Sequence, residues 1–184
     1  MSTEKAPPPS TLAALMQDKP KRGRPRHAVS RQSVYIELSL EQKSLTKELA
    51  ARMPKEISRA DIPDLAISTL AARMDSLRQA VSGRSREIPE GITDFDSLYL
   101  LWDLSLPEQN NHLKWTSVRL SPQPSIDLGR LHGMFNAVFG TSRSETYNLG
   151  LALLDEFINK HLDIIEGNPE SLDGWRKLIA SYYL

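Results

Sequence analysis

Two short stretches of the chain, residues 33–38 and 115–120, alternate apolar and polar residues. Successive side chains of a β-strand point to opposite faces, so this period of two predicts two strands with one apolar face each. Val34, Ile36 and Leu38 are the apolar set of the first stretch, and Thr116, Val118 and Leu120 form the corresponding set of the second. Because an isolated strand leaves its backbone groups unpaired, we expect these strands to pair, either with each other or with their equivalents in a second chain.

Two helical patterns follow the first predicted strand. Ser39 and Gln42 have the spacing of a capping box, and Pro54 ends the helix that they begin. A second helix has a start signal at Ser58 or Asp61; Asp61, with Asp64, is the better cap because Pro63 then falls in the first turn. The apolar stripe of this helix is Ile67, Leu70, Met74, Leu77 and Val81.

The same order recurs after the second strand. We expect a helix from Ser125 that Gly140 ends, and another from Ser142, with Glu145 completing a capping box. Their apolar stripes are Leu128, Leu131, Phe135, Val138 and Phe139 in one, and Tyr147, Leu151, Leu154, Ile158 and Leu162 in the other. Leu38-Ser39 and Leu120-Ser121 lie 82 residues apart, and Ser58-Arg59 and Ser142-Arg143 lie 84 apart. The spacing predicts an internal repeat of a strand-helix-helix unit.

The predicted fold class is therefore mainly α with short β-strands, a β-α-α unit present twice. The prolines and sparse apolar residues of 1–30 predict a disordered basic arm. The units occupy residues 31–82 and 113–163. The linker, residues 83–112, contains an apolar run from Phe95 to Leu106, which we expect to form a helix that packs against the core. Residues 164–184 predict a short terminal helix carrying Trp175, Leu178, Ile179 and Tyr182.

A short strand, a helix, a turn and a second helix opening with Ser-Arg-Ser-Glu resembles the ribbon-helix-helix (Arc/MetJ-type) family of DNA-binding proteins. Residues 142–145 have that opening, and residues 58–61, Ser-Arg-Ala-Asp, are similar to it. One unit of about 45 residues buries too little apolar surface to fold alone. The resemblance implies that two units pair their strands into an antiparallel ribbon, interlock four helices, and insert the ribbon into the major groove of DNA.

The resemblance also implies which residues contact DNA. The outward strand positions would meet base edges, and the backbone N–H groups at the two helix openings would hold phosphates. These candidates are Ser33, Tyr35, Glu37, Trp115, Ser117 and Arg119 on the strands and Ser58, Arg59, Ser142 and Arg143 at the openings. Arg119 is the best single candidate because the arginine side chain can donate two hydrogen bonds to one guanine.

Two outward positions leave alternatives open. Glu37 could accept a hydrogen bond from a cytosine amino group, but its charge repels phosphates. Trp115 could contact a thymine methyl group or cover an edge of the core or an interface. A role of one strand in protein contact instead of DNA contact therefore stays open.

Charge is balanced in total but not in distribution. Lys plus Arg and Asp plus Glu number 23 each; residues 1–60 hold 12 basic and 6 acidic side chains, and residues 61–184 hold 11 and 17. Within the basic end, residues 19–26 resemble the AT-hook, whose Gly-Arg-Pro centre lies in the minor groove of A·T-rich DNA. Arg22, Arg24, Arg26 and Arg31 are the further candidate DNA contacts.

Other classes of chemistry lack their motifs. The chain has no cysteine, and its four histidines are scattered without metal-ligand spacing, so we expect no metal site and no cofactor. It contains no nucleophile or phosphate-loop motif, and we expect that it is not an enzyme. Without a signal sequence or an apolar run of membrane length, a cytoplasmic, nucleoid-associated location and no membrane partner are expected.

The function predicted is sequence-specific binding of double-stranded DNA, foremost as a transcriptional regulator, with a homodimer or higher oligomer on DNA possible. Two alternatives are an accessory DNA-binding protein of a mobile element, acting in plasmid partition or a relaxosome, and an antitoxin-like interaction protein. In the last, the ribbon would bind DNA for autoregulation while a C-terminal segment binds a partner.

Overall fold

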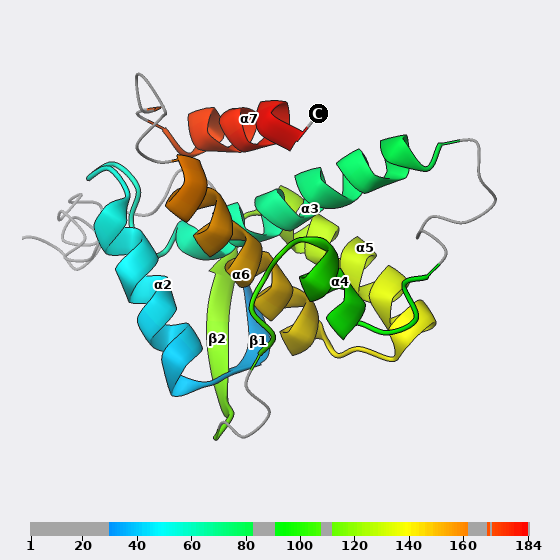
Figure 1. Ribbon diagram of the computed structural model, residues 1–184. Helices are drawn as coiled ribbons and strands as arrows, with labels where there is room; N and C mark the ends of the chain where they lie inside the picture. The colour runs from blue at the N-terminus through cyan, green and yellow to red at the C-terminus, as the bar shows by residue number, and fades with distance from the viewer. Residues whose placement is uncertain (1–29, 83–90, 108–111, 162–168, 170, 184) are drawn as a thin grey trace, which may run out of the picture.

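The computed structural model describes residues 30–82, 91–107, 112–161, 169 and 171–183 (Figure 1). Their elements run β1 (Gln32–Leu38), α2 (Leu40–Arg52), α3 (Ile62–Ala80), α4 (Asp96–Leu101), β2 (Lys114–Leu120), α5 (Pro122–Phe139), α6 (Arg143–His161) and α7 (Leu172–Tyr183). The protein is mainly helical, with one two-stranded antiparallel sheet among the described residues. That coarse fold class agrees with the sequence analysis.

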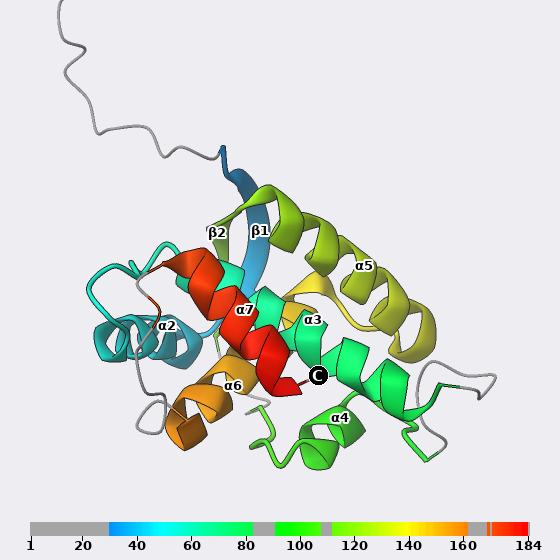
Figure 2. The same cartoon turned by 90° about the horizontal axis from the view of Figure 1, so that it is seen from above.

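The two strands pair with each other within one chain, which decides between the two pairings that the sequence left open. Tyr35 lies opposite Ser117 at the middle of the ladder, with Val34 opposite Val118 and Ile36 opposite Thr116 on either side. Helices α2 and α5 lie on opposite sides of this strand pair (Figures 1 and 2). The apolar sides of the strands face the core, where Ile36, Leu38 and Leu120 are at most 3% exposed.

Two helix starts confirm their predicted capping boxes. At α2 the N–H of Gln42 donates to Ser39 Oγ over 3.1 Å, and the N–H of Ser39 donates to Gln42 Oε1 over 2.8 Å. At α6 the N–H of Ser142 donates to Glu145 Oε2 over 2.6 Å, and the N–H of Glu145 donates to Ser142 Oγ over 3.2 Å. Local hydrogen bonds of this kind satisfy helix N–H groups that have no partner within the helix.

Two predicted boundaries were wrong. Helix α5 begins at Pro122 rather than Ser125. Proline is tolerated in the first turn because backbone N–H groups there have no acceptor within the helix, so the missing N–H of proline costs no helical hydrogen bond. The apolar run from Phe95 is helical only as far as Leu101. The chain then turns through Asp103, whose φ is 56°, and the N–H of Leu104 donates to Tyr99 O.

The start of α3 also differs from the expected cap. Asp61 precedes the helix, as predicted, but its side chain does not cap it. Its Oδ2 accepts hydrogen bonds from the N–H and the hydroxyl of Ser58, at 2.8 and 2.5 Å. Asp64, expected to assist this cap, instead accepts from the backbone N–H and hydroxyl of Ser121 at the start of α5, at 2.8 and 2.6 Å.

The buried core combines both halves of the described chain. One cluster joins residues of the strands, α2, α3, α5 and α6 with Trp175 and Ile179 of α7. A second cluster packs α4 onto α3, α5 and α6. The predicted stripes line these clusters with three exceptions: Val81 is buried but belongs to neither cluster, Val138 is 55% exposed, and Leu162 lies outside the described residues. The two sequence units therefore share their apolar surface.

Helices α3 and α6 pack tightly where Gly150 of α6 faces Ala66 of α3. A Cβ atom added to Gly150 of α6 would lie 2.8 Å from the carbonyl oxygen of Ala66 of α3. Such a distance leaves no room for a side chain. Gly150 therefore sets how closely the two longest helices of the described core can pack.

Candidate nucleic-acid interface

The outward side chains of the strand pair form a solvent-exposed face. We call this the outer ribbon face and define it by six residues: Ser33, Tyr35, Glu37, Trp115, Ser117 and Arg119. The register places them in three opposed pairs, Ser33 with Arg119, Tyr35 with Ser117, and Glu37 with Trp115. Glu37 is partly covered and the other five are exposed. The sequence analysis had assigned the same six residues to the outward side.

Two large aromatic side chains on this face are exposed to solvent. Tyr35 is 65% exposed and Trp115 is 69% exposed. Trp115 therefore covers no edge of the described core, which removes one of the alternatives left open for it. Exposed aromatic side chains grouped with polar ones are typical of surfaces that bind a partner.

The predicted phosphate-binding openings are both exposed. Ser58 and Arg59 lie in the turn before α3, and Ser142 and Arg143 lie at the start of α6. The dipole of a helix favours an anion at this end, although the N–H groups of Ser58 and Ser142 already donate to the carboxylates of Asp61 and Glu145, over 2.8 and 2.6 Å. The second opening is also tied to the ribbon, because the N–H of Glu37 donates to Ser144 Oγ over 2.8 Å.

One helix opening and one end of the ribbon share a hollow. Arg119 and Ser117 of β2 line it together with Ser58 and Arg59 before α3, and its volume is about 450 Å³. Lys43 of α2 lines the same hollow. Positions that the sequence analysis predicted to contact bases and phosphates therefore line one hollow.

Lys43 is the residue that the sequence analysis missed. It directly follows Gln42 of the capping box in α2 and is half-buried. Its only sequence signal is a cation on the polar side of a helix, which is common on any solvated surface. Its place in the same hollow as Arg119 distinguishes it, and that place depends on strand β2, more than 70 residues away in the chain.

Arg31 points away from this surface and into the protein. Its guanidinium donates to the carbonyl of Ala60 over 2.8 Å and forms an ion pair with Asp61. A second carboxylate, that of Asp64, lies 3.5 Å away, and the Arg31 side chain is only 10% exposed. Contact between Arg31 and DNA stays a prediction, but this guanidinium already has two internal carboxylates.

Asp61 keeps its charge in this setting. Burial acts to raise the pKa of Asp61, but hydrogen bonds from Ser58 and from Arg31, together with the charge of Arg31, outweigh it and hold the pKa below its usual value. The carboxylate therefore stays ionised and anchors both the turn before α3 and the residue that leads into β1.

The AT-hook-like residues Arg22, Arg24 and Arg26 lie outside the described residues. Their contact with the minor groove therefore stays a prediction. In the described chain, residue 31 leads directly into β1, so the arm is joined to the ribbon at the end where Ser33 and Arg119 pair.

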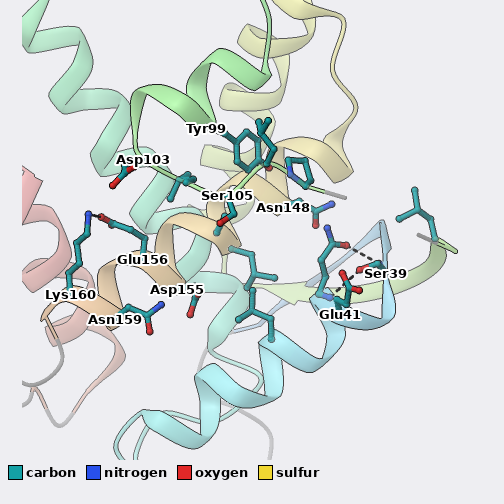
Figure 3. A pocket seen from close by; sticks show the side chains of 18 residues that line it. Ser39, Glu41, Tyr99, Asp103, Ser105, Asn148, Asp155, Glu156, Asn159 and Lys160 are labelled. Carbon is teal, nitrogen blue, oxygen red and sulfur yellow. Dashed lines mark hydrogen bonds and ion pairs between the residues drawn. The ribbon is translucent and has the colours of Figure 1, made fainter. Parts of the chain in front are cut away.

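A larger hollow of about 510 Å³ lies between α2, α6 and the segment after α4 (Figure 3). Its lining includes four carboxylates, those of Glu41, Asp103, Asp155 and Glu156. Lys160 is the one cation among the lining residues, and it pairs with Glu156 at 2.5 Å. This excess of negative charge would repel phosphates, so we do not include the hollow in the nucleic-acid surface.

Within the described part of the chain, no group of three or more His, Asp or Glu side chains is placed to hold a metal ion. None of the helices described there has the length and apolarity needed to cross a bilayer. Comparison of the chain with models of protein families, with curated proteins and with solved structures found no match.

Proposed function

We propose that this chain binds double-stranded DNA by placing its outer ribbon face in the major groove, as a single-chain protein of the ribbon-helix-helix kind, and that it regulates transcription. The observation that carries the proposal is the exposed outer ribbon face itself. It displays Arg119, hydroxyl groups and two aromatic rings, and no described element covers it.

The dimensions of the surface support the proposal. A two-stranded antiparallel ribbon fits the major groove, and its outward side chains, spaced two residues apart, meet successive base edges. Arg59 lies in the turn before α3, and Arg143 is the first residue of α6; the N-terminal ends of these helices attract phosphates. Phosphate contacts of this kind fix the register of a protein on the duplex.

The order of elements supports the resemblance to the ribbon-helix-helix family. β1, α2 and α3 are followed, after α4, by β2, α5 and α6, with residues of both sets in one core. Because β1 and β2 pair inside one chain, the ribbon needs no second chain to form. One chain would then suffice to bind one site.

The first experiment measures the affinity of the wild-type protein and of Arg119→Ala for duplex DNA selected from genomic fragments and for random duplex. Arg119→Ala should cost about 1–3 kcal/mol on the selected site and little on random DNA. Lys177→Ala, which removes an exposed cation of α7, is the matched control and should change neither affinity. Equal losses on both DNAs would show that Arg119 touches only phosphate.

Trp115 provides an independent readout of where DNA binds. Of the three tryptophans, Trp102 is 5% exposed and Trp175 is buried, so iodide should quench mainly Trp115. Bound DNA should protect this fluorescence, and the protection should be absent in Trp115→Phe. A protein that binds no duplex at low salt, or binds it with Trp115 still fully quenched, would refute the proposal.

The arm should strengthen binding without setting the sequence preference. Residues 19–31 hold six basic and no acidic side chains. Deleting residues 1–28 should lower affinity and flatten the plot of log affinity against log salt by about 0.9 for each phosphate that the arm neutralises. An unchanged salt slope would show that the arm neutralises no phosphate.

A further inference from the structure

The pairing of β1 with β2 is unchanged when the two strands are exchanged. A shift of 82 positions converts residues 32–38 into residues 114–120. The same exchange converts the pair Ser33 and Arg119 into the pair Trp115 and Glu37, which is also present in the register. It converts the central pair, Tyr35 and Ser117, into itself. The ribbon backbone therefore has an approximate twofold axis through Tyr35 and Ser117.

The helices follow the same exchange. Ala66 and Gly150 lie 84 positions apart, the spacing that separates Ser58-Arg59 from Ser142-Arg143. They also face each other, because a Cβ atom added to Gly150 would lie 2.8 Å from the carbonyl oxygen of Ala66, so the exchange converts this contact into itself. The approximate axis therefore extends from the ribbon into the core.

Side chains that face the core are similar at exchanged positions. Ile36 matches Val118, and Leu38 matches Leu120. At the helix openings Ser58 and Arg59 are identical in residue type to Ser142 and Arg143. The core-facing strand positions and the proposed phosphate-binding positions therefore have similar or identical residue types when the two units are exchanged.

The outer ribbon face departs from this symmetry at every position. Ser33 exchanges with Trp115, Tyr35 with Ser117, and Glu37 with Arg119. One end of the face presents a guanidinium beside a hydroxyl group, and the other presents a carboxylate beside an indole. The backbone framework therefore has approximate twofold symmetry, whereas the side chains of the proposed base-contacting face do not.

We infer that the chain recognises a DNA site that is not palindromic, with Arg119 and Glu37 selecting different bases at positions equally far from its centre. The inference rests on the proposed function, because it concerns what the same face selects. Identical chains in a twofold dimer must offer the same groups to both halves of a site, and a single chain with two different strands is free of that restriction.

The chemistry of the bases makes a palindrome unfavourable in either form. Guanine presents two acceptors in the major groove, O6 and N7, and suits Arg119. A palindrome with guanine at both ends would place those acceptors against the carboxylate of Glu37. Cytosine presents an N–H donor there and suits Glu37, but a palindrome with cytosine at both ends would place that donor against the donors of Arg119. An asymmetric site, with guanine opposite Arg119 and cytosine opposite Glu37, satisfies both side chains at equivalent positions.

The test starts with selection of sites for the full-length wild-type protein from a randomised duplex pool, under conditions where the mass of the complex shows one chain bound. The selected site and two palindromes, each built from one of its halves, are then compared by titration. Each palindrome should bind roughly tenfold to a hundredfold more weakly than the selected site.

A symmetrised variant provides a gain-of-function arm. Tyr35→Ser, Glu37→Arg and Trp115→Ser together give both strands the outward sequence Ser, Ser, Arg, and they alter only positions that lie outside the core. This variant should select a palindrome that matches the Arg119 half of the wild-type site. Circular dichroism checks its fold; should it fail to fold, the comparison of palindromes with wild-type protein still decides.

The possible failures are distinguishable. Selection of palindromes by one wild-type chain, or equal affinity for the selected site and the palindromes, would overturn the inference and leave the proposed function intact. Selection of no sequence, with weak binding to every duplex, would overturn the proposed function and the inference together.

Discussion

Replacing the buried carboxylate Asp64 should destabilise the protein more than replacing any exposed carboxylate. The side chain of Asp64 has no exposed surface, and its two oxygens accept hydrogen bonds from Ser121 N and Ser121 Oγ. Arg176 Nη2 lies 3.2 Å from Asp64 Oδ2, and Arg31 Nη2 lies 3.5 Å from it. One side chain of α3 thereby joins the start of α5, the residue before β1, and α7.

The magnitude follows from what Asp64→Ala would leave behind. Two hydrogen bonds to a charged acceptor contribute about 1.5–3 kcal/mol each, and removing one partner of a buried ion pair costs about 3–5 kcal/mol. These terms overlap. The side chain of Arg176 is also 23% exposed and keeps part of its hydration. We therefore expect a loss of about 3–4 kcal/mol of unfolding free energy, and roughly half of that for Asp64→Asn, which keeps one acceptor.

Urea unfolding followed by circular dichroism measures this loss, with Asp173→Ala as the matched control. Asp173 lies 3.2 Å from the same arginine, Arg176, but its side chain is 80% exposed. The control should change the unfolding free energy by less than about 0.5 kcal/mol. Comparable effects of Asp64→Ala and Asp173→Ala would refute the reasoning, because the prediction depends on the burial of Asp64 and on its hydrogen bonds from Ser121.

Two further predictions concern helix packing and pH. Gly150→Ala should destabilise the protein by about 1–3 kcal/mol because its Cβ would meet the Ala66 carbonyl. Gly133→Ala, in an open stretch of α5, should instead stabilise it by up to about 1 kcal/mol. Thermal unfolding measures both changes, and equal effects would contradict the close approach of Gly150 to Ala66. The lowered pKa of Asp61 means that its contribution to stability is present above the unfolded pKa of about 4 and is lost as pH falls through the folded pKa. Asp61→Asn should therefore lose less stability than the wild type as pH falls below about 4. Urea midpoints that fall equally with pH in wild type and variant would count against this prediction.

The outer ribbon face could be predicted from the sequence because the relevant physics is local. A period of two assigns each side chain of a strand to one of two faces, whatever the strand pairs with, and Val34 and Val118 alternate with polar neighbours. The capping boxes at Ser39 and Ser142 are local for the same reason, since their hydrogen bonds span three residues.

Other features depended on segments far apart in the chain. The alternation at residues 33–38 and 115–120 is equally compatible with pairing inside one chain or between two, and only the folded chain brings Tyr35 opposite Ser117. Arg31 belongs to a basic run that predicts an exposed cation, yet it lies against Asp61 and Asp64, about 30 residues away. Sequence spacing carries no signal for such an ion pair.

What the sequence by itself determined is which side chains of each strand face outward and where α2 and α6 begin, because hydrogen bonds and side-chain directions over a few residues decide both. What only the tertiary structure decided is which outward residues lie together. Arg119, Arg59 and Lys43 line one hollow, while the N–H of Glu37, the twofold counterpart of Arg119, donates to Ser144. Those groupings depend on how apolar surface from both halves is buried in one core, and burial is a property of the whole folded chain.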